Sequence, residues 1–346
     1  MIDDLKYIHE KDAQDALGIA EKQWQQYQQD HGFTWQPDRE IKSLVIAGMG
    51  GSGLAAIAAK NWLGLSIPYE VVHDYELPKF VDRNTLVICS SYSGNTEETL
   101  SCLEQALTSS SEDAKPMVII VASGGKMLEI AKYKNLPFIT LPGGFQPRMT
   151  FGYQLRALCE IFEQARLCSG TVDQLNQTST WLKNEIVTWI PTNSVKSNQA
   201  KQLALECIGK SPVIYAGPKL FPAAYKWKIS FNENAKNVAW YGEFPEFNHN
   251  EFLGWSSHPI KKPYTVIDLR SNLEHPQIQK RFEVTEKLLS GKRPAPLVIQ
   301  VRGETLAQQL LWTIALGDFV SIYTALLNGL NPTPVELVEK FKREII

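Results

Sequence analysis

Two loops rich in glycine and serine are the first features of this sequence that predict chemistry. The first, LVIAGMGGSGLAA at residues 44–56, follows a run of β-forming residues and precedes a helix of small residues. Its spacing, Gly48-x-Gly50-x-x-Gly53, matches a dinucleotide-binding fingerprint, and Asp74 lies where such a fingerprint places its ribose-binding carboxylate. The loop therefore predicts phosphate binding, with a nicotinamide dinucleotide as one candidate ligand.

A second loop, CSSYSGNTEETL at residues 89–100, follows the strand-like run TLVICS and leads into a helix. Ser91, Ser93 and Thr96 offer hydroxyl donors, while Gly94 allows the backbone to pass close to a ligand. Loops that enter helix N-termini from neighbouring strands present N–H groups and a partial positive charge to one point. The second loop therefore predicts a site for one compact phosphate.

The two loops together favour a sugar phosphate over a dinucleotide. A dinucleotide places its pyrophosphate on the first loop and does not require a second loop rich in serine and threonine. Helix capping explains either loop alone, because Ser, Thr and Asn are preferred at any helix start, but it does not require both. We therefore expect the phosphate to be bound by Gly51, Ser52, Ser91, Ser93 and Thr96.

Strand-like and helix-like segments alternate on both sides of a helical stretch. The strand-like runs are SLVIAG, YEVVHDY, TLVICS, PMVIIVAS and PFITLP before it, and SPVIYAG, NVAWY, YTVIDLR and PLVIQVRG after it. This alternation indicates parallel sheets covered by helices, because neighbouring parallel strands need long crossovers. We expect a helical segment at 1–40, α/β domains at 41–165 and 199–346 joined by a helical linker at 166–198, and a closing C-terminal helix.

The composition is that of a globular protein whose partners are small molecules or other proteins. The 346 residues are 44% hydrophobic and include 35 basic and 37 acidic side chains, for a net charge of −2. No long Lys/Arg run exists to bind nucleic acid or lipid, and no apolar run approaches the ~18 residues of a membrane span. The absence of a secretory signal and of C-x-x-C spacing among the five cysteines predicts free thiols in the cytoplasm.

Several motifs, in order along the chain, resemble a known family. Gly51-Ser52 followed by SYSGNTEET at 91–99 resembles the sugar isomerase (SIS) domain. PRMTFGY, NENAK, EFNHNE and the tail PTPVE, at 147–153, 232–236, 246–251 and 332–336, narrow the resemblance to the bifunctional phosphoglucose/phosphomannose isomerases, from about residue 40 onward. The resemblance implies two SIS domains, each an α-β-α sandwich, and interconversion of glucose 6-phosphate or mannose 6-phosphate with fructose 6-phosphate.

The resemblance also implies roles for two residues in the proton transfer between C1 and C2. This transfer passes through a cis-enediol and needs a base and a stabiliser of negative charge, without a metal or redox cofactor. Glu233 in FNENAK matches the family's base; without the family match it would be interpreted as an exposed glutamate at a helix end. Arg148 matches the PR motif and would hydrogen-bond the enediolate oxygens, while a salt bridge is its structural alternative.

Ring opening is assigned by the resemblance to a histidine and a lysine. His249, in EFNHNEF, suits proton transfer to the ring oxygen, and in the family this histidine is contributed across a dimer interface. The resemblance therefore implies a homodimer with composite active sites. Lys342 matches the ring-opening lysine through TPVELVEKFK alone, with Lys340 as the neighbouring alternative.

Three alternatives follow from the same residues. A zinc-dependent phosphomannose isomerase would need clustered His and carboxylate ligands. The six histidines are scattered without H-x-H or H-E-x-x-H spacing, so we expect no bound metal. A regulatory protein that binds a sugar phosphate without chemistry would explain the two loops but not the acid–base set. An NAD-dependent dehydrogenase would explain the glycine spacing and predicts binding of a nicotinamide cofactor. The sequence does not distinguish glucose from mannose epimers.

Overall fold

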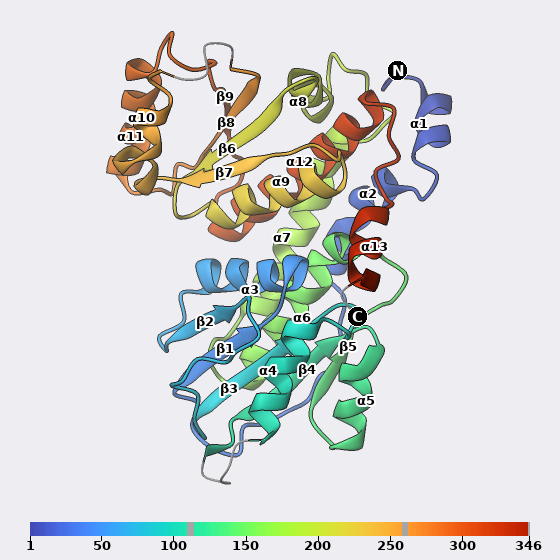
Figure 1. The fold of residues 1–346 in the computed structure, drawn as a ribbon, viewed down its shortest axis with the longest axis vertical. Helices are drawn as coiled ribbons and strands as arrows, with labels where there is room; N and C mark the ends of the chain where they lie inside the picture. The colour runs from blue at the N-terminus through green and yellow to red at the C-terminus, as the bar shows by residue number, and fades with distance from the viewer. Residues whose placement is uncertain (109–113, 258–261, 345–346) are drawn as a thin grey trace. The chain divides into compact units, whose positions relative to one another are not determined.

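The computed structural model describes residues 1–108, 114–257 and 262–344. It divides into two compact units (Figure 1). Residues 23–180 form the glycine-loop unit, named for the two loops that it contains, and residues 1–22 with 181–346 form the C-terminal unit. Each unit contains its own parallel sheet flanked by helices, which confirms the predicted α/β class.

The glycine-loop unit contains a five-stranded sheet in the order β2-β1-β3-β4-β5, with every pairing parallel. The strands are β1 (Ser43–Ala47), β2 (Tyr69–Val72), β3 (Thr85–Ser90), β4 (Met117–Ala122) and β5 (Phe138–Thr140). Every residue of β1, β3 and β4 is buried. Their continuous runs of Val, Ile and Leu are typical of parallel strands that are covered on both faces.

Helices cover both faces of this sheet. On one face, Cys102 of α4 (Glu97–Thr108) and Met127 of α5 (Gly125–Tyr133) pack in one core cluster with side chains of β1, β3 and β4. On the other, Tyr69 of β2 donates a hydrogen bond to the Ala56 carbonyl of α3 (Gly50–Leu63) at 2.8 Å. The Tyr69 ring also lies 6.0 Å from that of Phe162 in α6 (Phe151–Gln164), so α3 and α6 cover this second face.

The C-terminal unit contains a four-stranded parallel sheet in the order β7-β6-β8-β9. Its strands are β6 (Ser211–Ala216), β7 (Trp240–Glu243), β8 (Tyr264–Arg270) and β9 (Leu297–Gln300). The order repeats that of β2-β1-β3-β4 in the glycine-loop unit. The two units therefore share a topology, as expected from the recurrence of the strand–loop–helix pattern along the sequence.

The helices of the C-terminal unit carry the segments of functional interest. From residue 199 onward they are α8 (Gln199–Cys207), α9 (Phe221–Glu233), η4 (Glu246–His249), α10 (Glu251–Gly254), α11 (Pro276–Leu288), α12 (Leu306–Leu327) and α13 (Glu336–Glu344). Trp227 of α9 donates its Nε1–H to the Thr313 carbonyl of α12 at 2.7 Å. Phe247 of η4 and Phe282 of α11 pack in one core cluster with Tyr215 of β6. Figure 1 shows helices flanking this sheet.

Helix α12 is the hydrophobic centre of the C-terminal unit. Among the described residues it is the one helix that is long and apolar enough to cross a membrane, with a mean hydropathy of 1.7 over its best window. The expectation that no apolar stretch reaches this length was therefore too strict. Because 89% of that window is buried inside the structure, α12 is accounted for as a core helix.

The N-terminal residues pack within the C-terminal unit. Helix α1 (Leu5–Lys11) is anchored by the Tyr7 hydroxyl, which donates to the Leu326 carbonyl at 2.7 Å, and the buried Lys201 ammonium contacts the Asp3 carboxylate at 2.9 Å. Three elements lie at or near the boundaries between the units, namely α2 (Ala16–Gln26), α7 (Thr171–Ile186) and η3 (Val187–Trp189).

Candidate active site

The two loops predicted to bind phosphate leave the same edge of the glycine-loop sheet. β1 and β3 are neighbours, with Ala47 paired to Cys89, so the loops that follow them begin side by side. The Tyr92 N–H of the second loop donates to Ser52 Oγ of the first at 3.3 Å. The structure thus places the two loops in direct contact.

Hydrogen bonds within the second loop fix its shape. Ser91 Oγ and Thr96 Oγ1 lie 2.8 Å apart, and the Gly94 N–H donates to Ser91 Oγ at 3.2 Å. Ser91 is only 2% exposed, whereas Ser93 is exposed and its Oγ accepts the Asn95 N–H at 3.3 Å. The loop is preformed at the start of α4, where helix N–H groups favour an anion.

A turn carrying Arg148 lies against the first loop. This turn is the short helix η2 (Pro147–Met149), and Arg148 is 2% exposed. A Cβ added to Gly51 would lie 3.0 Å from the Pro147 carbonyl oxygen, so the two segments are in close contact at that position. The glycine-loop unit therefore brings Arg148 to the segment that contains Gly51 and Ser52.

The glycine spacing of the first loop has a packing explanation that the sequence did not reveal. His73 Nδ1 lies 2.8 Å from the Gly48 carbonyl oxygen, and a Cβ on Gly53 would lie 2.2 Å from His73 Cε1. Asp74, the candidate ribose ligand, accepts the N–H of the adjacent Tyr75 at 2.7 Å. Gly53, the last glycine of the fingerprint, is thus explained by packing against His73, without a dinucleotide.

Gly94 provides a direct test of the second loop. Its φ is +68°, and an added Cβ would lie 1.9 Å from the Gly124 carbonyl oxygen. We expect Gly94→Ala to weaken binding of fructose 6-phosphate by at least about tenfold and to lower the melting temperature, because the loop must move to relieve the overlap. Calorimetric titration measures the affinity. Gly143→Ala is the matched control, since its added Cβ meets nothing within 4 Å; equal affinities for both variants would contradict the assignment.

The predicted base lies in the C-terminal unit, at the end of a firmly held helix. Glu233 is the last residue of α9 and is half-buried. One residue further, Asn234 Nδ2 donates to Ser321 Oγ of α12 at 2.9 Å. Two turns earlier, the buried Lys226 ammonium pairs with the Asp318 carboxylate of α12. These contacts fix the helix that presents Glu233.

The residues predicted to open the sugar ring also lie in the C-terminal unit. His249 is the last residue of η4, and its side chain is exposed. Lys342 belongs to α13, but its side chain lies outside the described part of the structure; the alternative, Lys340, is exposed on the same helix. The predicted site residues thus fall in both units: the phosphate loops and Arg148 in one, and Glu233, His249 and α13 in the other.

In the C-terminal unit, a carboxylate lies at the position that corresponds to the phosphate loops. The loop after β6 begins with Gly217, where an added Cβ would lie 2.5 Å from Glu274 Oε1. The same oxygen accepts the Lys219 N–H at 2.7 Å, just before α9, and burial raises the pKa of the Glu274 carboxyl. β8 has the same place in this sheet as β3 in the other, so the segment after β8, which contains Glu274, corresponds to the segment after β3, which contains Ser91. An internal carboxylate thus lies where the first unit presents its hydroxyls, which the sequence did not reveal.

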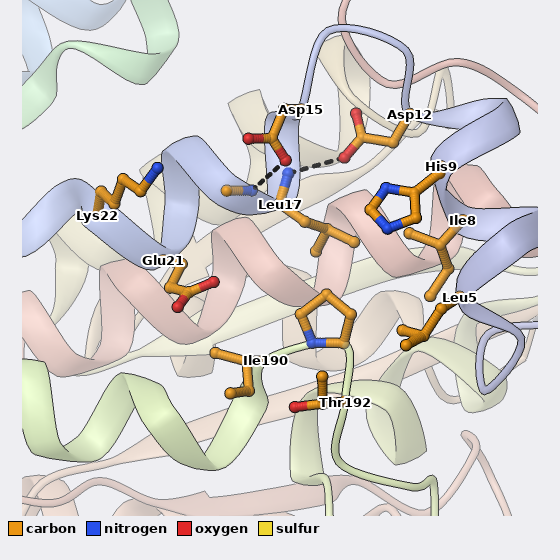
Figure 2. A pocket seen from close by; sticks show the side chains of 12 residues that line it. Leu5, Ile8, His9, Asp12, Asp15, Leu17, Glu21, Lys22, Ile190 and Thr192 are labelled. Carbon is orange, nitrogen blue, oxygen red and sulfur yellow. Dashed lines mark hydrogen bonds between the residues drawn. The ribbon is translucent and has the colours of Figure 1, made fainter.

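A pocket of about 280 Å³ lies elsewhere in the C-terminal unit, between α1, α2 and residues 190–192 (Figure 2). None of the predicted site residues lines it. Asp12 accepts the Leu17 N–H at 2.9 Å and Asp15 accepts the Gly18 N–H at 3.1 Å, so both carboxylates are engaged at the start of α2. We assign no ligand to this pocket.

Within residues 1–108, 114–257 and 262–344, no group of three or more His, Cys, Asp or Glu side chains is arranged to hold a metal ion. The five cysteines are free, and four of them are buried. Burial raises the pKa of the Cys102 thiol to about 11, so this thiol stays protonated at neutral pH.

Solved structures with the same fold cover nearly the whole chain. A hypothetical protein from Thermus thermophilus aligns with a TM-score of 0.69 at 15% identity, over 98% of this chain and 89% of its own. The tagatose-6-phosphate ketose/aldose isomerase from Escherichia coli aligns with a TM-score of 0.63 at 13% identity, over 85% and 84%. At sequence identities this low, the structural similarity shows a shared fold and nothing about function.

Sequence comparison identifies the family. The model of the bacterial phospho-glucose isomerase C-terminal SIS domain matches residues 196–345. The bifunctional phosphoglucose/phosphomannose isomerase of Aquifex aeolicus is 34% identical over 88% of this chain and 90% of its own length. The D-glucosamine-6-phosphate 4-epimerase of Sulfolobus acidocaldarius is also 34% identical, over 66% of this chain and 71% of its own. The chain belongs to the bifunctional phosphoglucose/phosphomannose isomerase family.

Proposed function

We propose that this protein is an aldose–ketose isomerase that interconverts glucose 6-phosphate or mannose 6-phosphate with fructose 6-phosphate. Membership of the bifunctional phosphoglucose/phosphomannose isomerase family supports this class of reaction. The observation that supports a hexose phosphate as ligand is the contact between the loops of Ser52 and Ser91, next to the turn of Arg148. These groups suit one phosphate and one adjacent oxyanion.

The proposed mechanism gives each group of predicted site residues one part of the chemistry. Gly51, Ser52 and the second loop hold the phosphate, which fixes C1 and C2 of the open-chain sugar for proton transfer. Glu233 removes the proton from one carbon and returns it to the other. Arg148 is always charged and stabilises the negative charge that develops on the enediolate oxygens.

Ring opening precedes this step and requires a separate proton donor and acceptor. We assign it to His249 together with a lysine of α13, either Lys342 or Lys340. The exposed imidazole of His249 supports its contribution to the site of a second copy, in a homodimer. We place the protein in cytoplasmic carbohydrate metabolism, because these hexose phosphates are shared by glycolysis and gluconeogenesis.

Coupled assays on glucose 6-phosphate, mannose 6-phosphate and fructose 6-phosphate, with and without a chelator, test this proposal. We expect turnover of fructose 6-phosphate and at least one aldose phosphate, unaffected by the chelator, because proton transfer through an enediol needs no metal. Glucosamine 6-phosphate is the comparison substrate, since a relative is named for its epimerisation. Saturable binding of fructose 6-phosphate without turnover would instead indicate a regulatory sugar-phosphate-binding protein.

A further inference from the structure

The segment that carries His249 is anchored on both sides of this residue. Phe247 is 2% exposed, and its ring lies 4.6 Å from that of Tyr215 in β6 and 5.0 Å from that of Phe244. Asn248 Nδ2 donates to Thr285 Oγ1 of α11 at 2.9 Å. His249 itself is exposed. The fold therefore holds the residues before His249 and leaves its imidazole accessible.

The residues after His249 are held as firmly. The Asn250 side chain accepts the Glu251 N–H at the start of α10 and donates to Glu246 Oε1 at 2.6 Å. The Glu251 carboxylate accepts a hydrogen bond from the Tyr215 hydroxyl, although Glu251 is an exposed residue. This bond ties the segment to β6, one of the two inner strands of the sheet, only two residues beyond His249.

Tyr215 is well placed to be a permanent donor to Glu251. Its side chain is fully buried, and its hydroxyl also accepts the Nε1–H of Trp255 at 2.9 Å. Burial and the Glu251 charge raise the pKa of Tyr215 well above its usual value, so the hydroxyl keeps its proton. The Arg293 guanidinium lies over the Tyr215 ring, 5.5 Å from its centre, in a cation–π contact.

We propose that Tyr215 is a positioning residue for His249 that acts through Glu251. The hydrogen bond fixes the backbone that follows His249, which keeps the imidazole at the distance that proton transfer to the ring oxygen requires. Misplacing a catalytic group by about 1 Å costs on the order of 100-fold in rate. This inference rests on the proposed function of His249.

The first experiment compares two buried tyrosines of the C-terminal unit. Tyr215→Phe removes the bond to Glu251 and keeps the ring. We expect kcat for glucose 6-phosphate to fall about tenfold with little change in KM. Tyr323→Phe is the matched control: it removes an equally buried hydroxyl, which donates to the Trp189 carbonyl at 2.6 Å, far along the chain from His249. The control should lose thermal stability but keep kcat.

A double variant separates positioning from a general loss of structure. If Tyr215 acts through His249, then Tyr215→Phe lowers kcat no further once His249→Asn is present, because the positioned group is gone. Equal kcat losses in Tyr215→Phe and Tyr323→Phe, or a full Tyr215→Phe loss on top of His249→Asn, would overturn the inference.

The same set of proteins reports separately on the proposed function. Wild-type protein without isomerase activity would remove the basis of both proposals. An active wild-type protein with a fully active His249→Asn variant would refute the role of His249 and, with it, the role of Tyr215. An impaired His249→Asn variant beside a fully active Tyr215→Phe variant would overturn the positioning role alone.

Discussion

Glu233→Gln is expected to lower kcat for fructose 6-phosphate isomerisation by about 1,000-fold, the range that a general base contributes. Glutamine has nearly the same size and occupies the same half-buried end of α9, but it cannot accept a proton from carbon. Binding should be preserved, because the phosphate loops lie in the other unit. Timed activity assays measure kcat, and calorimetric titration measures the affinity for fructose 6-phosphate.

The matched control for this prediction is Glu243→Gln. Glu243 is another partly buried carboxylate of the same unit, at the end of β7, and burial raises its pKa. We expect this variant to keep kcat within about threefold, since the resemblance gives it no role in proton transfer. Turnover of Glu233→Gln comparable to that of Glu243→Gln would refute the assignment of the base.

Lys226→Met is expected to lower the free energy of unfolding of the C-terminal unit by about 3 kcal/mol, because it leaves a carboxylate without its cation in a largely buried site. The Lys226 side chain is 2% exposed and that of Asp318 is 17% exposed. Ser230 completes the network: its Oγ accepts from Lys226 at 2.8 Å and donates to Asp318 at 2.7 Å. Calorimetry of the unfolding transition measures the loss.

Two further variants decide what the network contributes. The double variant Lys226→Met/Asp318→Leu should recover most of the lost stability, because replacing both members of a buried pair by apolar groups is often nearly neutral. Lys228→Met, two residues along α9 at a half-exposed position, should change stability by less than about 0.5 kcal/mol. A loss in Lys226→Met no larger than in Lys228→Met would show that the buried pair is dispensable.

The sheets were predictable because their strands are simple in sequence. All nine runs identified as strands contribute to β1 to β9, and the wholly buried β1, β3 and β4 are rich in Val, Ile or Leu, as is typical of parallel strands covered on both faces. The contact between the two loops predicted to bind phosphate followed from the order of these strands. Loops that follow neighbouring parallel strands must meet at one edge, and the bond from Tyr92 to Ser52 shows that they do.

Other features depend on contacts between distant segments, which no local pattern reveals. Tyr215 and Glu251 are 36 residues apart. Glu274, which follows β8 in the chain, contacts the loop after β6. Residues 1–22 pack with the C-terminal unit through such contacts as that of Asp3 with Lys201, although they directly precede the other unit in the chain. The packing role of Gly53 was hidden for the same reason, because His73, which lies against it, is outside the motif.

Proton transfer between C1 and C2 by this chain is tested most directly by isotope incorporation. The protein is incubated with fructose 6-phosphate in D₂O, and the aldose phosphate products are examined by proton NMR. We expect glucose 6-phosphate or mannose 6-phosphate carrying deuterium at C2, because a base that exchanges its proton with solvent delivers deuterium to C2 of the enediol. Unchanged fructose 6-phosphate after prolonged incubation at saturating concentration would contradict it.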